Sequence, residues 1–175
     1  FLFVDRDGVI NRDRPQSVCS IADFEMLPGV GKALAALNDA GYHIVVITNQ
    51  ACVGRGDLSR AELERIHERL REEVAAHGAV IRDIFICPHT DDDRCDCRKP
   101  KPGLLLQAAE KHGIDLSSTW FIGDARRDVE AALAAGCRPA MVRTGKPLDG
   151  ALPAAVPVYD DLGAFAAALG KQDIT

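Results

Sequence analysis

The sequence predicts an α/β protein: a three-layer α/β/α sandwich with a central parallel sheet, Rossmann-like in its alternation of strand and helix. Short apolar runs rich in Val and Ile alternate along the chain with segments whose apolar residues recur at helical spacing. Such alternation is typical of parallel strands joined by crossover helices. The length of 175 residues suits one domain, so we expect a single domain over residues 1–175.

Each element has its own local signal. Buried strands are expected wherever a short apolar run ends at polar residues, namely at residues 1–4, 43–47, 81–87, 120–122, 139–143 and 156–159. Helices are expected where apolar residues recur every three or four positions, namely at residues 30–37, 59–77, 102–112, 125–136 and 162–169. Gly41 and Gly78 lie where helix-ending glycines are typical, and Ser59 and Glu62 form a capping-box pattern.

Composition limits the possible partners. A net charge of −5 argues against a nucleic-acid surface, and no apolar run approaches the roughly 20 residues of a membrane helix. Three of the six cysteines cluster and three are scattered, which favours a reducing, cytoplasmic compartment and one clustered metal site over a disulfide scaffold. We expect a monomer that binds neither nucleic acid nor membrane. The sequence starts at Phe1, and we expect at least one residue before it.

Polar side chains follow four of the predicted strands. They are Asp5 and Asp7 after the first, Thr48, Asn49 and Gln50 after the second, Arg98 and Lys99 beyond the third, and Asp124 after the fourth. Parallel strands place their carboxyl ends at one edge of the sheet, where ligands bind. We therefore expect these side chains to converge there.

The converging groups fit phosphoryl transfer. Three carboxylates are hard oxygen ligands that suit Mg²⁺, and a carboxylate can attack phosphorus. Asp5 and Asp7 are separated by one residue and point the same way in an extended segment, so one can attack while the other shuttles a proton. Lys99, Thr48 and the N–H groups of the Asp7–Gly8 turn could neutralise the phosphate charge. The alternative for the two aspartates is a plain polar turn after a strand.

At this point the motifs D-R-D-G-V, T-N-Q, R-K-P-K-P-G and G-D-A-R-R-D resemble those of the haloacid dehalogenase (HAD) superfamily of aspartate-nucleophile phosphatases. Within it the chain is similar to the heptose bisphosphate 7-phosphatases and the related histidinol-phosphate phosphatases, over about residues 1–147. The resemblance implies a capless HAD-like fold with a zinc-binding loop.

The resemblance also implies roles for individual residues. Asp5 would be the nucleophile and a Mg²⁺ ligand, and Asp7 the general acid/base with its backbone carbonyl on the metal. Asp124 would complete the metal site. Asp128 receives no firm role, and a charge at a helix N-terminus is the alternative. The remaining roles are phosphoryl binding by Thr48, Asn49 and Lys99, and substrate contact by Arg98, Asp13 and Gln50.

The activity implied is Mg²⁺-dependent hydrolysis of a phosphomonoester through an aspartyl-phosphate intermediate. The substrate would be a small phosphorylated sugar, D-glycero-D-manno-heptose 1,7-bisphosphate, losing its 7-phosphate on the way to an ADP- or GDP-activated heptose for lipopolysaccharide. The segment R-T-G-K at 143–146 favours this substrate. One alternative is histidinol-phosphate hydrolysis, and a remote one is a zinc-binding interaction module without catalysis.

A second metal site is predicted by Cys87, His89, Cys95 and Cys97. Three cysteines and one histidine form a closed, structural Zn²⁺ set with no open position for catalysis. The alternatives are four loop residues without metal, or a catalytic zinc. The loop at 87–97 runs directly into Arg98 and Lys99, so a bound ion would orient them.

The sequence departs from the family pattern in two places. Ala51 and Cys52 replace the usual Ser-Gly after T-N-Q, and Ala125 replaces a frequent Lys after Asp124. On the leaving-group side, Arg12 and Arg14 would suit a second anionic group of the substrate. No span between motifs is long enough for a separate cap domain.

Overall fold

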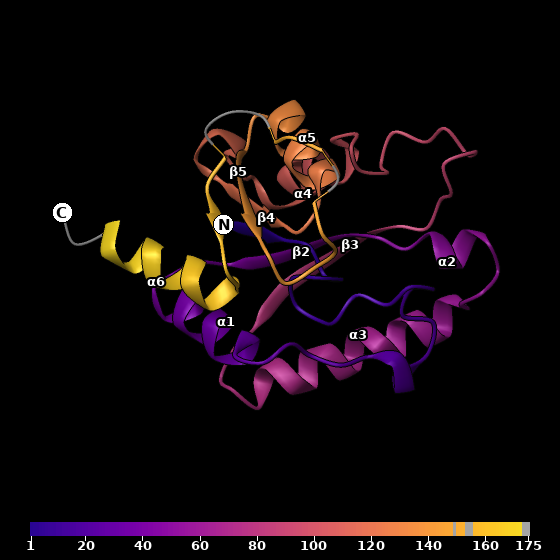
Figure 1. The fold of residues 1–175 in the computed structure, drawn as a ribbon, viewed down its shortest axis with the longest axis horizontal. Coiled ribbons are helices and arrows are strands. Elements are labelled where there is room, and N and C mark those ends of the chain that lie inside the picture. Colours follow the sequence, from indigo (N-terminus) through magenta and orange to yellow (C-terminus); the bar gives the residue numbers. More distant parts are fainter. Residues whose placement is uncertain (149, 153–155, 173–175) are drawn as a thin grey trace.

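A single six-stranded parallel sheet organises the chain (Figure 1). The computed structural model describes residues 1–148, 150–152 and 156–172. The strand order is β3-β2-β1-β4-β5-β6 and every neighbouring pair is parallel. The strands are β1 (Leu2–Val4), β2 (Ile44–Asn49), β3 (Ile81–Cys87), β4 (Trp120–Gly123), β5 (Arg138–Val142) and β6 (Val158–Tyr159).

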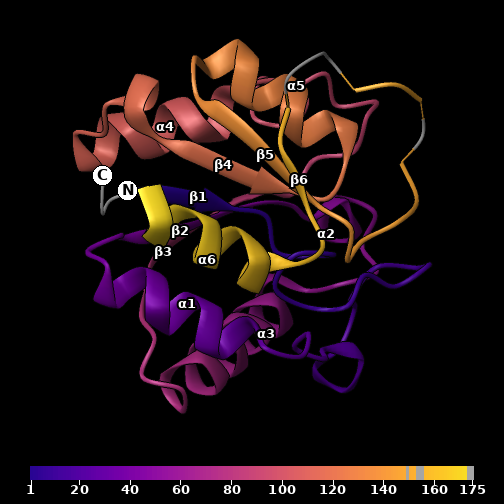
Figure 2. The ribbon, with the colours of Figure 1, turned by 60° about the vertical axis from the view of Figure 1, so that its left-hand side comes forward.

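Helices cover both faces of this sheet, as the sequence predicts. One face carries α1 (Val30–Asp39), α3 (Arg60–Ala75) and α6 (Leu162–Gln172), and the other carries α4 (Gly103–His112) and α5 (Arg126–Ala135) (Figure 2). Between these elements, the described residues form loops (those after β1 and β3 are long), the one-turn helix α2 (Ala51–Gly54) and two 3-10 turns at Ile21–Asp23 and Leu116–Ser118. No separate cap domain is present in that part of the chain.

The two faces have separate apolar cores because side chains alternate along each strand. Leu2 and Val4 of β1 pack with the helices α1, α3 and α6, whereas Phe3 packs with α4 and α5. All three side chains are fully buried. Burial on both faces explains why the strands read as continuous apolar runs rather than as alternating patterns.

The predicted boundaries differ from the observed ones by one or two residues in most elements. β2 continues to Asn49 because its pairing with β3 extends to Asn49 opposite Cys87. Ser59 caps α3 by accepting a hydrogen bond from the Glu62 N–H at 3.1 Å. The other half of the predicted capping box is replaced, since the Glu62 side chain instead accepts from the Ile21 N–H.

The topology defines where a ligand would bind. The strands β2 and β3 follow β1 on one side of it in the sheet, and the chain then crosses to the other side of β1 to form β4. The loops after β1 and β4 therefore separate at the carboxyl edge and leave a crevice there. None of the helices in the described part of the chain is both long and apolar enough to span a membrane.

Candidate active site

The predicted polar residues converge at this crevice. Asp5 follows β1, Asp124 follows β4, and Thr48 lies near the end of β2. Lys99 reaches the same place from the long loop after β3. All four residues are buried, with at most 3 % of each exposed, so their charges and hydrogen bonds must be satisfied inside the protein.

Lys99 lies at the centre of the site. Its Nζ is 2.9 Å from Asp5 Oδ1 and 2.7 Å from Asp128 Oδ1. The same ammonium donates to the Ile47 carbonyl at 3.0 Å. Burial disfavours the charge, but Asp128 and Asp5 outweigh burial and raise the pKa of Lys99. Lys99 is therefore held as a cation against the carboxylate that the sequence predicts as nucleophile.

Three carboxylates share the crevice, and they attract a cation. Oxygens of Asp5, Asp124 and Asp128 all lie within 4.8 Å of one another. Burial and the charges of the neighbouring carboxylates raise the pKa of Asp124 to about 8. Burial also raises the pKa of Asp5, to about 6; the positive charge of Lys99 opposes this rise, and the negative charge of Asp128 adds to it. Asp124 Oδ1 is buried without a hydrogen-bond partner among the described residues. An unsatisfied carboxylate oxygen beside two others fits a divalent cation such as Mg²⁺.

Two glycines leave no space beside Asp124. Gly8 has φ +84°, and a Cβ there would overlap the Asp124 carboxylate, as would a Cβ on Gly145. Gly145 belongs to the loop after β5, and Thr144 Oγ1 in the same loop donates to the Gly8 carbonyl at 2.6 Å. The backbones at Gly8 and Gly145, from two loops far apart in sequence, thus pack closely against the Asp124 carboxylate and restrict its position.

Asp7 faces away from the acidic cluster. Its carboxylate accepts from Arg6 at 2.9 Å and 3.0 Å, from Asn11 at 2.9 Å and from Gln50 at 2.8 Å. Burial alone would raise the pKa of Asp7. The positive charge of Arg6 and the hydrogen bonds from Asn11 and Gln50 have a larger effect, so the net result is a lowered pKa. The Gly8 N–H donates to the Asn11 carbonyl at 2.8 Å, so one of the N–H groups of the Asp7–Gly8 turn predicted to face the phosphate already has an acceptor in this structure.

Arg6 is itself fully buried, and one of its hydrogen-bond partners comes from α3, which is distant in sequence. Its Nη1 lies 3.3 Å from Nε2 of His67, which is buried in α3. A guanidinium only donates, so Nε2 of His67 must be the acceptor. Burial and the charge of Arg6 lower the pKa of His67 to about 3, which keeps the ring neutral and able to accept. His67 is therefore a buried residue of α3 whose ring is satisfied by Arg6.

The residues of the T-N-Q motif contact the site in different ways. Gln50 Nε2 donates to both Asp7 and Thr48 Oγ1, at 2.8 Å and 2.9 Å. Asn49 bonds the Lys99 backbone in both directions, since its Nδ2 donates to the Lys99 carbonyl and its Oδ1 accepts from the Lys99 N–H, each at 3.1 Å. In this structure Asn49 therefore fixes the loop that carries Lys99.

The other predicted substrate residues are engaged in ion pairs. Arg98 Nε lies 2.6 Å from Asp91, and Asp13 lies 3.0 Å from Lys146 Nζ. Arg12 and Arg14, proposed above for a second anionic group, are both paired with Glu25. Their side chains can still exchange these partners for a ligand, because the pairs are at least partly exposed.

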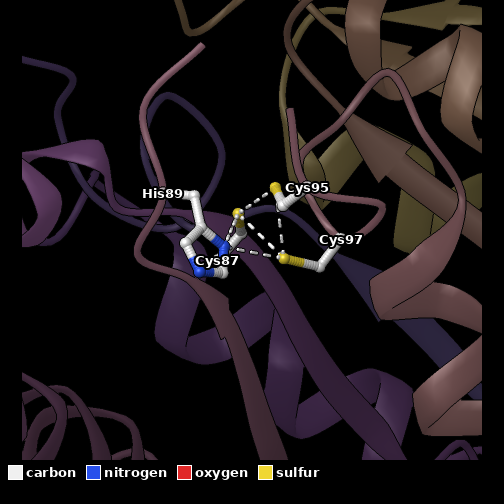
Figure 3. A group of neighbouring side chains, drawn as sticks. All are labelled: Cys87, His89, Cys95 and Cys97. Atoms are coloured by element: carbon white, nitrogen blue, oxygen red, sulfur yellow. Dashed lines mark hydrogen bonds between the residues drawn. The ribbon is translucent and has the colours of Figure 1, made fainter. Parts of the chain in front are cut away.

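The cysteine and histidine side chains of the loop after β3 point toward one another (Figure 3). Cys97 Sγ is 3.2 Å from both Cys87 Sγ and His89 Nδ1, and Cys95 Sγ is 3.6 Å from Cys87 Sγ. These separations exceed the length of a disulfide, and they are close to the roughly 3.5–3.8 Å between ligands on one tetrahedral zinc ion. The thiols are free, and the pKa of Cys95 falls to about 7 because hydrogen bonds overcome burial.

Sequence reasoning missed three residues that contact the site. Asp128 was left without a firm role, yet it forms the shorter ion pair with Lys99. Its place four residues after Asp124 in the same motif was the available signal. Gly145 lies in the R-T-G-K segment, which indicated the substrate but not a contact with Asp124, and His67 gave no signal of its contact with Arg6.

Comparison with known proteins agrees with this geometry. The family model for HAD-hydrolase-like proteins matches residues 96–165. A D-glycero-beta-D-manno-heptose-1,7-bisphosphate 7-phosphatase of Pseudomonas aeruginosa is 46% identical over 171 residues, which cover 96% of this chain and 96% of that protein. The protein of the same name from Escherichia coli is 38% identical, over 84% of this chain and 81% of its own.

Among solved structures, the D,D-heptose 1,7-bisphosphate phosphatase of B. bronchiseptica, complexed with magnesium and phosphate, superposes with a TM-score of 0.93. It is 38% identical, and the match covers 98% of both chains. The corresponding enzyme of Burkholderia thailandensis has a TM-score of 0.74 at 36% identity, with 96% of each chain covered.

The contact between His67 and Arg6 predicts an unusual core substitution. We expect His67→Leu to lower the free energy of unfolding by about 1–3 kcal/mol, although Leu is more apolar, because a buried guanidinium N–H loses its acceptor. His67→Gln can keep an acceptor and should lose less. Urea unfolding of both variants, with exposed His43→Leu as the control, measures this. A His67→Leu protein as stable as the wild type would contradict the contact.

The acidic cluster predicts a pH dependence. Since the pKa values of Asp5 and Asp124 are raised above their ordinary 3.8, the metal-free folded protein holds protons that the unfolded chain has lost. Their stabilising contribution is complete below about pH 4 and is lost as the pH rises through about 6 and about 8. The Tm of the metal-free protein should therefore fall over this range relative to that of Asp124→Asn.

The increase of Tm on adding Mg²⁺ should grow over the same range, because the ion competes with protons for the carboxylates. Thermal unfolding at pH 5.5, 7.0 and 8.5, with and without Mg²⁺, measures both effects. A Mg²⁺-induced shift that is independent of pH, or that persists in Asp124→Asn, would show that the ion binds elsewhere.

Proposed function

The chain belongs to the family of D-glycero-beta-D-manno-heptose-1,7-bisphosphate 7-phosphatases, within the HAD-like hydrolases, and we propose that it removes the 7-phosphate of that sugar bisphosphate. The observation that carries the proposal is the buried pair of Asp5 and Lys99 at the carboxyl end of β1. A carboxylate held beside a fixed cation, in an acidic crevice, is what an aspartate nucleophile for phosphoryl transfer requires.

We propose that Mg²⁺ is the catalytic ion. Asp5, Asp124 and the backbone carbonyl of Asp7 would hold it, and the unsatisfied Asp124 Oδ1 supports this assignment. The solved relative from B. bronchiseptica contains magnesium and phosphate. Bound there, the ion would neutralise charge on the transferring phosphoryl group and on the two carboxylates.

The chain's own residues then divide the reaction into two steps. An oxygen of Asp5 attacks phosphorus, the bond from phosphorus to the sugar oxygen breaks, and Asp7 gives a proton to that oxygen. In the second step Asp7 takes a proton from water, whose oxygen attacks phosphorus and releases phosphate and Asp5. Lys99 stabilises the phosphoryl charge in both steps. Because Asp7 rests as a carboxylate held by Arg6 and Gln50, it must first take up a proton from water before it can donate one to the sugar oxygen.

We propose that the remaining predicted residues bind the substrate. Thr48, Asn49 and Lys99 would contact the transferring phosphoryl group, and Arg98, Asp13 and Gln50 the rest of the molecule. Each borders the crevice or the loops that lead to it. Arg98 and Asp13 would exchange their present partners, Asp91 and Lys146, for the substrate.

We further propose that Cys87, His89, Cys95 and Cys97 bind a structural zinc ion. Their four ligand atoms surround one point at separations that suit a tetrahedral ion, and no position remains open for catalysis. The Arg98 guanidinium donates to the His89 carbonyl at 3.3 Å, so the ion would fix the loop that carries this arginine. We also propose that the protein is cytoplasmic, which its free cysteines favour, and that it acts as a monomer.

The activity is tested by comparing two substrates and one variant. We expect kcat/KM for the heptose 1,7-bisphosphate to exceed that for histidinol phosphate by more than roughly tenfold, a difference of about 1.4 kcal/mol. Asp5→Asn should lose at least about a thousandfold in kcat while its Tm stays near that of the wild type, because the nucleophile is removed but not its volume.

Three outcomes would overturn this assignment. Faster hydrolysis of histidinol phosphate would move the chain to the related activity. An active Asp5→Asn variant would refute the nucleophile, and a wild-type protein inactive on every phosphomonoester would favour a zinc-binding interaction module. Arg82→Gln, a change at the opposite edge of the sheet, serves as the matched control for expression and folding.

The zinc proposal makes a separate prediction. Cys95→Ser should lose the ion and lower the Tm, and KM should rise more than kcat falls. The reason is that Arg98 depends on the loop, whereas Lys99 is also held by Asn49, Asp5 and Asp128. Elemental analysis should find about one zinc per wild-type chain. Cys137→Ser, a buried cysteine outside the cluster, is the control. Metal-replete protein without zinc would refute the site.

A further inference from the structure

Most cations that border the crevice already have an acidic partner. The ion pairs are Arg6 with Asp7, Lys99 with Asp5 and Asp128, Arg98 with Asp91, Arg12 and Arg14 with Glu25, and Lys146 with Asp13. The proposed substrate carries two phosphates, and only one of them can lie against Asp5 and Lys99. Partly exposed pairs can exchange their partners for a phosphate, but a cation without an acidic partner binds the second phosphate without first breaking an ion pair.

Arg127 is such a cation. It is the second residue of α5, and no hydrogen bond or ion pair joins its guanidinium to any other residue that the structure describes. Its neighbour Arg126, by contrast, is paired with Glu130 at 2.7 Å. Arg127 is exposed at its surface, and although desolvation opposes its charge, Asp128, Asp5 and Asp124 outweigh this effect and raise its pKa. The guanidinium therefore lies within the field of the catalytic carboxylates without touching one.

Arg127 also lines a hollow that reaches the reaction centre. The hollow has a volume of about 410 Å³, and its walls include Asp124, Arg127, Lys146, Pro100 and Leu148. This size suits a small ligand. Because Asp124 belongs both to the acidic cluster and to the wall, a sugar whose one phosphate lies at Asp5 can extend into the hollow.

We infer that Arg127, with Lys146 at the edge of the hollow, binds the phosphate that the substrate retains. A guanidinium matches phosphate through two parallel hydrogen bonds, and a lysine adds a second positive charge. This inference rests on the proposed function, and it assigns the role that Arg12 and Arg14 were expected to have. Arg127 would thus be a specificity-determining residue that selects bisphosphates over monophosphates.

The test compares substrates that differ by one phosphate. In Arg127→Gln, kcat/KM for the heptose 1,7-bisphosphate should fall about tenfold to a hundredfold, mainly through KM, because charge-assisted hydrogen bonds are lost. Activity on heptose 7-phosphate, which lacks the retained group, should change less than about twofold. Arg127→Lys should recover part of the loss, since it keeps the charge but not the paired geometry.

A binding measurement gives a second readout without turnover. The Kd of the product heptose 1-phosphate, measured by calorimetry, should rise in Arg127→Gln by a factor similar to the loss in kcat/KM. Arg82→Gln removes one positive charge far from the site and should behave as the wild type in both assays. Its side chain lies near the start of β3, at the edge of the sheet opposite the crevice.

The outcomes separate this inference from the function on which it rests. Equal losses on both substrates would mean that Arg127 only balances the acidic cluster, and no loss on either would mean that it binds nothing; each result overturns the inference. A wild-type protein that hydrolyses the bisphosphate no better than the monophosphate would instead overturn the proposed selectivity, whatever Arg127 does.

Discussion

The site depends on one buried ammonium group between two carboxylates. Lys99 comes from the loop after β3, Asp5 from the end of β1 and Asp128 from α5, so a single charged contact joins three parts of the fold. A buried charge without partners would cost several kcal/mol, which means that these parts must assemble together or not at all. The excess of negative charge that remains in the crevice is what a divalent metal ion and a cationic loop can balance.

Charge balance also explains the neighbouring contacts. Asp124 has an oxygen without a partner, and two glycine backbones hold that side chain in place. Asp7 is only two residues from Asp5, but its carboxylate does not join the acidic cluster because it accepts hydrogen bonds from Arg6 and Gln50 instead. Two aspartates that are close in sequence therefore have opposite environments. One has a raised pKa and the other a lowered pKa, because Asp5 is buried beside other carboxylates whereas Asp7 is buried beside Arg6 and hydrogen-bond donors.

Much of the fold could be predicted from the sequence, because apolar runs and helical spacing directly report burial. The strands were placed within one or two residues, and the convergence of Asp5, Thr48, Lys99 and Asp124 followed from the parallel sheet alone. What could not be predicted was the choice of partner. Arg14 was expected to face a ligand and instead pairs with Glu25, since a charged residue's partner depends on loop paths that leave no periodic signal. The short helix α2 was missed because a single turn has no periodicity.

The fully buried Arg6 carries a consequence for how the molecule folds. It is next to the nucleophile in sequence, but one of its hydrogen-bond acceptors, His67, is supplied by α3, more than sixty residues later. Until α3 docks, the guanidinium that follows the first strand is paired with Asp7 but lacks the acceptor that His67 provides, so its burial leaves one N–H unsatisfied. A chain that has formed only its first strands thus gains little from collapsing around them. Partly assembled forms should accordingly be scarce at equilibrium, and unfolding should be a single cooperative transition in which the reaction centre and the core are lost together.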